Sequence, residues 1–214
     1  MPPAGLGENA GVSAEHEPEH PTAEGGPGEQ GPGTSAPDRP RRLLLLFAVA
    51  VVLLALDVVT KVAAVSALEG RPPVRVLGGL VYLDLVRNPG AAFSLATGMT
   101  WLLAVLAIVV ACVIGWLSRK LRSAGWAVGL GAVLAGTCGN LADRLFREPG
   151  PLQGHVVDFV SLLAPGGHVW PVFNVADSSI VCGAALVVLM SLLGRDYDGT
   201  VHRRQAADRS GGGA

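Results

Sequence analysis

The sequence predicts an all-α membrane protein with four transmembrane helices, both termini in the cytoplasm, and a small β element on the outer face. Two observations predict this fold class. Half of the 214 residues are hydrophobic and only 15% are charged, with a mean hydropathy of +0.46, which is typical of integral membrane proteins. Lys and Arg also gather beside alternate ends of the apolar runs, as they do in cytoplasmic segments.

The first 40 residues have the composition of a disordered tail. They are rich in Gly, Pro, Glu and Ala and contain almost no large apolar side chains, so they cannot bury enough surface to offset the entropy of ordering. The apolar run after the basic cluster at 39–42 is longer than a signal-peptide core, which predicts a retained first helix. The expected organisation is a tail at 1–40, a four-helix domain at 41–195 and a second disordered tail at 196–214.

Four apolar runs are the expected transmembrane helices. Each must be helical because backbone groups in lipid have to hydrogen-bond within their own segment. About 20 residues are needed to cross the hydrocarbon core, so the two shorter runs need flanking residues at the interface. The runs span 43–65, 101–117, 126–141 and 172–193.

The positive charges predict how these helices are oriented. Clusters of Lys and Arg precede the first run, fill the short link at 118–125 and follow the fourth run. Because cytoplasmic segments carry an excess of Lys and Arg, these three places lie in the cytoplasm. The longer connections at 66–100 and 142–171 then face outward.

The first outer connection contains the expected β element. Residues 74–87 mix Val, Leu and Tyr around Gly78 and Gly79, and the run 81–86 has the composition of a strand. This predicts a small β-hairpin or ribbon on the outer membrane face. An ordered apolar loop without a sheet is the alternative.

Three aspartates are the candidate catalytic residues. Asp143 follows the third apolar run, Asp177 lies near the start of the fourth, and Asp158 lies on the connection between them. Because these two helices run antiparallel, the three carboxylates can converge just below the outer surface, where acids usually mark a function. Two carboxylates that share a site hold one proton between them, so one can act on a water as general base and the other as general acid.

The neighbours of each aspartate favour Asp158 with Asp177 as the pair. Asp143 is followed by Arg144, whose permanent charge would keep a nearby carboxylate ionised and suits a structural or substrate-orienting role. Asp158 has only Val and Phe beside it, which favours a shared proton. Chemistry alone does not exclude a pair that includes Asp143. It also does not exclude that any one of the three acids is a solvated loop carboxylate at the membrane interface without a catalytic role.

No cofactor, metal or nucleic acid is expected. Cys112, Cys138 and Cys182 lie in apolar stretches without metal-ligand spacing, so they are expected to be small packing residues. His155 and His168 are far apart in sequence and form no HxH or HxxxH pair, which argues against a metal held with the acids. No basic patch with interleaved aromatic residues indicates a nucleic-acid partner.

Five short motifs follow one another between residues 43 and 193. They are Asp57-Val58-Val59-Thr60-Lys61, Asn88-Pro89-Gly90-Ala91-Ala92-Phe93, Gly139-Asn140-Leu141-Ala142-Asp143-Arg144, Val156-Val157-Asp158-Phe159 and Phe173-Asn174-Val175-Ala176-Asp177. In this order they resemble the lipoprotein signal peptidase (type II signal peptidase) family. The resemblance implies an aspartyl endopeptidase of the bacterial cytoplasmic membrane that removes signal peptides from diacylglyceryl-modified prolipoproteins, cutting before the lipidated cysteine.

The resemblance also implies roles for single residues. The acids that match Asp158 and Asp177 form the catalytic dyad of that family. The polar positions associated with substrate binding or support of the dyad are matched by Asn88, Asn140, Arg144 and Asn174. From their own chemistry we add Gly90 and Asp143 to these candidate substrate-binding or support residues. The chain departs from the family pattern in its long N-terminal tail and in the extra stretch 147–154, which precedes the motif around Asp158.

Three of the motif residues have a structural explanation beside the functional one. Asp57 and Lys61 are four residues apart on the first helix, so they can form an ion pair across one turn, which we favour over a direct role. Gly90 allows close approach of backbone or lipid, although a tight turn explains a glycine equally well.

Together these observations predict a monomeric peptidase at the outer face of the cytoplasmic membrane, surrounded by membrane lipids and acting on lipidated prolipoproteins. The rival is a small transporter or proton-relay protein in which the same acids carry ions. A conduction path needs polar groups across the whole membrane, whereas the acids here collect at the outer end. A scaffold without activity would leave the motifs around Asp158 and Asp177 unexplained.

Overall fold

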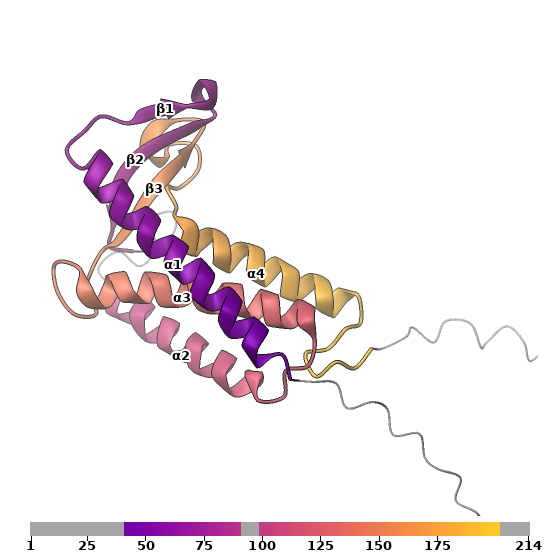
Figure 1. The fold of residues 1–214 in the computed structure, drawn as a ribbon. Coiled ribbons are helices and arrows are strands. Elements are labelled where there is room, and N and C mark those ends of the chain that lie inside the picture. Colours follow the sequence, from indigo (N-terminus) through magenta and orange to yellow (C-terminus); the bar gives the residue numbers. More distant parts are fainter. Residues whose placement is uncertain (1–40, 91–98, 202–214) are drawn as a thin grey trace, which may run out of the picture. The chain divides into compact units, whose positions relative to one another are not determined.

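The computed structural model describes residues 41–90 and 99–201. The expected tail at 1–40, the motif residues Ala91, Ala92 and Phe93, and positions 202–214 lie outside the described residues. Within the described chain, four long helices form a bundle and three strands form a small sheet at one end of it (Figure 1).

The four expected helices are present and each is long and apolar enough to cross a membrane. The third ends at Phe146 instead of position 141, so Asp143 and Arg144 lie inside the helix. The fourth begins at Val175 instead of position 172, because Asn174 caps its first turn. The helices are α1 (Leu43–Leu68), α2 (Thr100–Ser118), α3 (Ala124–Phe146) and α4 (Val175–Leu192).

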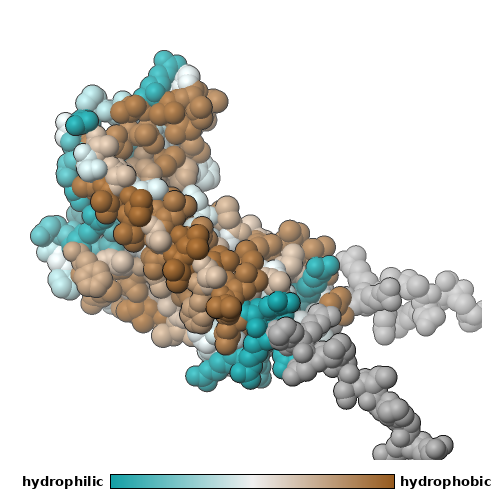
Figure 2. All heavy atoms as spheres, viewed as in Figure 1, coloured by the Kyte–Doolittle hydropathy of each residue, from teal (hydrophilic) through white to brown (hydrophobic). Residues whose placement is uncertain are grey.

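The central helix of the bundle is α3, which packs against α1, α2 and α4. Its most apolar 18-residue window is 56% buried, against 17% for the corresponding window of each other helix. Large apolar side chains such as Val59, Trp116 and Val181 stay exposed on the other helices, and Figure 2 shows apolar surface along the bundle. Such a surface fits contact with lipid.

Glycines bring α3 and α4 close together. A Cβ atom on Gly183 would lie 2.6 Å from the carbonyl oxygen of Gly129, and one on Gly136 would lie 2.7 Å from Cγ1 of Ile180. Small residues at a helix–helix contact are typical of membrane bundles, where close backbone approach increases van der Waals packing. This contact places the end of α3 beside the start of α4.

The sheet is larger than the sequence predicted. β1 (Val74–Val76) and β2 (Val81–Asn88) form the expected hairpin, and β3 (Val156–Leu162) joins the other edge of β2 as a further antiparallel strand. The segment around Asp158, expected to be a loop, is therefore a strand. The register opposes Val86 to Asp158, which brings the end of β2 beside the acid.

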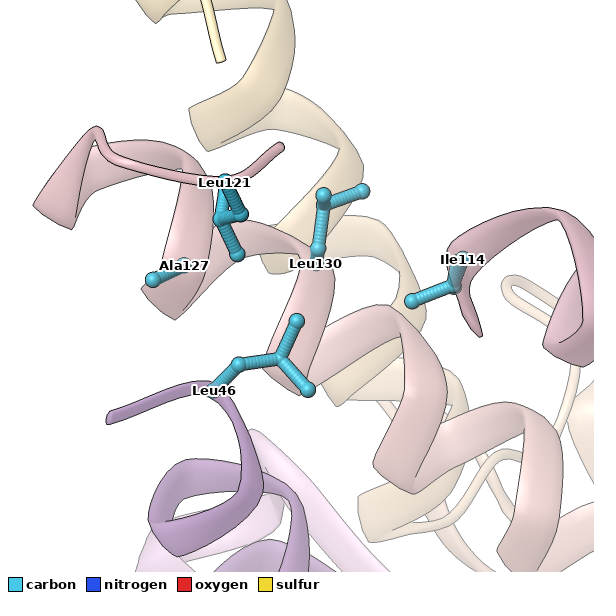
Figure 3. Packing of buried hydrophobic residues seen from close by; sticks show 5 residues of the cluster. All are labelled: Leu46, Ile114, Leu121, Ala127 and Leu130. Atoms are coloured by element: carbon cyan, nitrogen blue, oxygen red, sulfur yellow. The ribbon is translucent and has the colours of Figure 1, made fainter. Parts of the chain in front are cut away.

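Two apolar clusters hold the two ends of the described domain. At the end without the sheet, Figure 3 shows buried side chains from α1, α2, α3 and the link between α2 and α3. They are Leu46, Ile114, Leu121, Ala127 and Leu130. At the other end Ala64 and Leu68 of α1 pack with Val157 and Phe159 of β3. The strand that carries Asp158 is thus anchored on α1.

The first residues of the expected C-terminal tail at 196–214 are held in a turn. The backbone N–H groups of Arg122 and Ser123 donate to the carbonyl oxygen of Tyr197 at 2.8 and 3.1 Å. The Tyr197 ring also packs edge-on against Trp126, with the ring centroids 6.0 Å apart. The folded chain thus extends past the boundary expected at 195, because this ring has an apolar partner on α3.

Candidate active site

Asp158 lies inside β3 and is only 1% exposed. The amide Nδ2 of Asn88 donates to its Oδ2 at 2.9 Å, and that of Asn174 donates to its Oδ1 at 2.7 Å. Burial raises the pKa of Asp158 to about 7, and the charge of Asp177 contributes to the same shift. The two amide hydrogen bonds and the charge of Lys61 oppose it. Asp158 therefore keeps its proton where an ordinary carboxyl group is ionised.

Asp177 lies in the first turn of α4 and forms a capping box with Asn174. Oδ1 of Asn174 accepts from the backbone N–H of Asp177 at 2.9 Å, and Oδ2 of Asp177 accepts from the backbone N–H of Asn174 at 3.1 Å. Its Oδ1 accepts from Nδ2 of Asn140 at 2.7 Å. The carboxylate of Asp177 thus lies at the positive end of the helix and accepts from two N–H donors.

The two aspartates line one cavity of about 530 Å³ at the junction of the sheet with α3 and α4. Asn174 does not line it but lies behind both acids, because its side chain bonds to each. The predicted residues that line the cavity are Asn88, Gly90, Asn140, Arg144, Asp158 and Asp177. Residues from four separate motifs are thus brought together around one space.

Arg144 supplies the positive charge of the cavity. It is 8% exposed, and its guanidinium donates to the carbonyl oxygens of Asn140 and Gly90, each at 3.1 Å. Its Nε has no hydrogen-bond partner among the described residues. Gly90 in turn donates its backbone N–H to Oδ1 of Asn88 at 2.9 Å, so the arginine ties the end of β2 to α3.

Asp143 does not line the cavity and belongs to a buried ion cluster beside it. Its Oδ2 lies 2.9 Å from Nζ of Lys61 and accepts from the backbone N–H of Val157 at 3.2 Å, while its Oδ1 accepts from Nε of Arg147. The expected pair of Asp57 and Lys61 is present, with 2.9 Å between Oδ2 and Nζ. Asp57 also accepts from the backbone N–H of Ala176 at 2.9 Å.

An apolar wall completes the cavity, and sequence reasoning missed it. The wall comes from β3, from the connection between β3 and α4, and from the side of α4. Its residues are Val156, Leu162, Trp170, Pro171, Val172, Phe173, Ile180, Val181 and Cys182. Phe173 is held there by a β-bridge to Val160, in which the backbone N–H and carbonyl groups of Val160 both form hydrogen bonds with the backbone of Phe173. No local sequence pattern predicts this pairing.

His155 and His168 are not among the residues that line the cavity of Asp158 and Asp177. His155 lines a separate cavity of about 250 Å³ together with Thr100, Trp101 and Gln153. His168 lies against Gly166, in the connection between β3 and α4. Among the described residues, no group of three or more His, Cys, Asp or Glu side chains is arranged to hold a metal ion.

Comparison with known proteins identifies the family to which the chain belongs. The family model described as signal peptidase (SPase) II matches residues 49–193, which is more than half of the chain. The chain belongs to the signal peptidase II family. The match includes α1 from residue 49 onward, the whole of α2, α3 and α4, and every cavity residue described above. Signal peptidase II proteins are hydrolases, and with its four apolar helices this chain is a multi-pass membrane protease.

Relatives named lipoprotein signal peptidase support the same family. One from Mycobacterium avium (strain 104) is 55% identical over 184 residues, covering 85% of this chain and 98% of the relative. One from Rhodococcus jostii (strain RHA1) is 56% identical over 172 residues, covering 79% and 84%. One from Mycobacterium tuberculosis (strain ATCC 25618 / H37Rv) is 54% identical over 182 residues, covering 85% of each.

Two solved structures described as a bacterial membrane enzyme share the fold. Both are 24% identical to this chain and cover 72% of it, with TM-scores of 0.63 and 0.62. The alignments cover 92% and 97% of the solved chains. The described helices and sheet therefore follow an arrangement already known for a membrane enzyme.

Proposed function

We propose that this signal peptidase II family member is an aspartyl endopeptidase that removes signal peptides from diacylglyceryl-modified prolipoproteins, cutting before the lipidated cysteine. The observation that carries the proposal is the position of Asp158 and Asp177 on one cavity, close enough for their charges to interact. The names of the relatives support the substrate class. The other polar side chains that line the cavity include the amides of Asn88 and Asn140, the guanidinium of Arg144 and the hydroxyl of Ser178.

The different surroundings of the two acids support a different role for each. Asp177 lies at the positive end of α4 and accepts two N–H groups, so it is the ionised general base. Asp158 is almost fully buried, which disfavours a charge, so it holds the proton and is the general acid. One proton in the pair is the arrangement that aspartic proteases use.

The reaction proceeds without a covalent enzyme intermediate. Asp177 takes a proton from a water whose oxygen attacks the scissile carbonyl carbon, while Asp158 gives its proton to the carbonyl oxygen, which yields a gem-diol. The proton on Asp177 then passes to the amide nitrogen, Asp158 takes a proton from the diol, and the C–N bond breaks. Both carboxyl groups return to their starting states.

The two sides of the cavity match the two parts of such a substrate. Asn88 and the guanidinium of Arg144 offer N–H donors for peptide carbonyl groups on the polar side. The apolar wall, with Ile180 and Val181 on α4, suits the hydrocarbon of a signal helix in the membrane. The diacylglyceryl chains stay in the lipid around the bundle.

The distribution of charge supports an active site at the outer face. The end of the bundle opposite the sheet carries exposed basic residues before α1, between α2 and α3 and after α4, and these are Arg41, Arg42, Arg119, Lys120 and Arg195. A basic end is the cytoplasmic end of most membrane proteins. The cavity lies at the other end, which is where a secreted lipoprotein would be cut.

The decisive experiment compares the purified full chain with Asp158→Asn and Asp177→Asn. Each substitution should abolish cleavage of a lipidated prolipoprotein, because an amide neither accepts nor releases the catalytic proton. Glu69→Gln is the matched control, since it makes the same change on an exposed carboxylate that pairs with Arg87 away from the cavity. Thermal unfolding should stay unchanged in a folded variant that has lost activity.

The substrate class is tested in the same assay. Wild-type protein should cleave the lipidated prolipoprotein and leave the unlipidated form intact. Ordinary turnover by either folded aspartate variant would overturn the dyad, while equal cleavage of both substrates would overturn the lipid requirement and keep the dyad.

A further inference from the structure

Lys61 is an almost fully buried charged side chain next to the candidate active site. It is 1% exposed and lies on α1, at the level of the cavity but outside its lining. Its Nζ lies 2.9 Å from Oδ2 of Asp57 and 2.9 Å from Oδ2 of Asp143. These contacts fit a structural ion cluster, which is the role that the sequence predicts.

A third contact leads from Lys61 towards the dyad. Nζ donates to Oδ1 of Asn140 at 3.1 Å. A lysine ammonium group has three N–H donors, and here three acceptors surround it. Asn140 is the neutral one among them, so this contact adds little to the charge balance and needs a different explanation.

The amide of Asn140 has an oxygen end and a nitrogen end, and the surroundings fix which faces the dyad. Its Oδ1 accepts from Lys61 and from Nδ2 of Asn174 at 3.2 Å, while its Nδ2 donates to Oδ1 of Asp177 at 2.7 Å. Rotating the amide by half a turn would place NH2 against the ammonium group. It would also place the oxygen against the carboxylate, so both contacts would become repulsive.

Asn174 alone is a weak means of fixing this orientation. Its two amide hydrogens are shared among Oδ1 of Asn140, the carbonyl oxygen of Val157 and Oδ1 of Asp158, and the last contact is the shortest at 2.7 Å. The contact with Asn140 at 3.2 Å is therefore one branch of a shared donor. The charged donor from Lys61 is the stronger constraint.

We propose that Lys61 is a positioning residue of the active site, which orients the amide of Asn140 so that its N–H group holds the ionised carboxylate of Asp177 in place. The inference rests on the proposed function, because it gives Asp177 the role of general base. Lys61 makes no hydrogen bond to either acid of the dyad, so its hydrogen-bonded path to the site runs through Asn140. Its charge also favours the ionised form of Asp158, and this effect is equally absent from two variants that both lack the charge. A residue counted as structural thus becomes part of the catalytic arrangement.

The test needs variants that do not leave a buried charge unpaired, since breaking a buried ion pair is strongly destabilising. The double variant Asp57→Asn/Lys61→Met removes one negative and one positive charge together and leaves Asp143 with Arg147. Asn at position 57 keeps an oxygen for the N–H of Ala176. The partner variant Asp57→Asn/Lys61→Gln has the same charge but restores an N–H donor for Asn140.

The expected result is a split between kcat and KM in prolipoprotein cleavage. A lost hydrogen bond to a charged group should lower kcat of the Met variant about tenfold or more relative to Asp57→Asn, with KM changed by less than about twofold. The Gln variant should recover most of the loss. A purely structural role predicts similar kinetics for the Met and Gln variants when their unfolding temperatures agree.

Three results would overturn the inference. They are a Met variant with undiminished kcat, a Gln variant no better than an equally stable Met variant, and a loss that appears in KM alone. If the Met variant does not fold, the Gln variant decides: a kcat more than about fivefold below that of Asp57→Asn overturns the inference, and a smaller loss supports it.

Asp177→Asn, measured in parallel, separates the two proposals. Activity in that variant would remove the proposed function and the inference with it. An inactive Asp177→Asn beside a fully active Met variant would remove the role of Lys61 alone.

Discussion

At the scale of single residues, Asn174 links the two candidate catalytic acids. Its Nδ2 donates to Asp158 and its Oδ1 accepts from the backbone of Asp177. The same side chain therefore begins a helix and orients a carboxyl group on a strand. Asp158 is buried and Asp177 lies at a helix N-terminus, so two identical side chains are suited to opposite roles in proton transfer.

The pKa of Asp158 predicts how activity depends on pH. Because that pKa is raised to about 7, the proton is present below pH 7 and is lost as the pH rises through this value. The kcat/KM of peptide cleavage should therefore fall as the pH rises through about 7. A profile that stays flat between pH 6 and about 9 would contradict the assignment of Asp158 as the acid.

Asn88→Ala offers a directional check on the same limb of the profile. The Asn88 hydrogen bond favours the ionised form of Asp158 and lowers its pKa, so its removal should raise that pKa. The falling limb of kcat/KM should then move to higher pH, whereas in Glu69→Gln it should stay in place. Movement to lower pH would show that Asn88 does not act on Asp158 in this way.

At the scale of elements, the contact between α3 and α4 positions the acid of one helix against the amide of the other. Asn140 on α3 reaches Asp177 on α4 at 2.7 Å. The approach depends on positions without side chains, such as Gly136, whose added Cβ would meet the carbonyl oxygen of Ala176 and Cγ1 of Ile180. The contact between α3 and α4 therefore contributes to the stability of the bundle and also sets the geometry of the site.

Gly136→Ala should therefore reduce both stability and cleavage. The methyl group would push the first turn of α4 away from α3, at a cost of about 1–3 kcal/mol in the free energy of unfolding. Gly115→Ala is the matched control, because the same methyl group on α2 would have nothing within 4 Å. Thermal unfolding and cleavage rates measure both effects, and equal behaviour of the two variants would contradict the prediction.

At the scale of the whole molecule, the site is assembled where the bundle meets the sheet. β3 contributes Asp158, β2 and the segment directly after it contribute Asn88 and Gly90, α3 contributes Asn140 and Arg144, and α4 contributes Asp177. The apolar cluster of α1 with β3 fixes the sheet on the bundle. Every one of these elements lies between residues 43 and 193.

Deleting residues 2–37 should leave the specific activity largely unchanged. That segment has no pattern of apolar residues with which to build a site. The truncated and full-length proteins should be compared at equal membrane content, with prolipoprotein cleavage as the measurement. Loss of activity in a truncated protein that inserts and unfolds normally would show that the segment takes part.

Several parts of the fold could be predicted because they depend on local composition. The four helices follow from apolar runs that lipid forces into helical form, and the hairpin of β1 and β2 follows from a strand-like run beside two glycines. The strand around Asp158 could not be predicted in this way. It pairs with β2 across about 70 residues of chain, and such long-range pairing leaves no local sequence pattern.

The candidate site likewise has features that could be predicted from the sequence and features that could not. The amino-acid sequence is enough to mark Asp158 and Asp177 as unusual, because charged side chains in apolar surroundings are costly and usually serve a function. Three further features are visible only in the folded chain: Asp143 bonds to Lys61 and Arg147, Asn174 bonds to both remaining acids, and an apolar wall lines the same cavity. Those facts depend on the side-chain directions and distances between separate elements, which are set by packing and not by the order of residues.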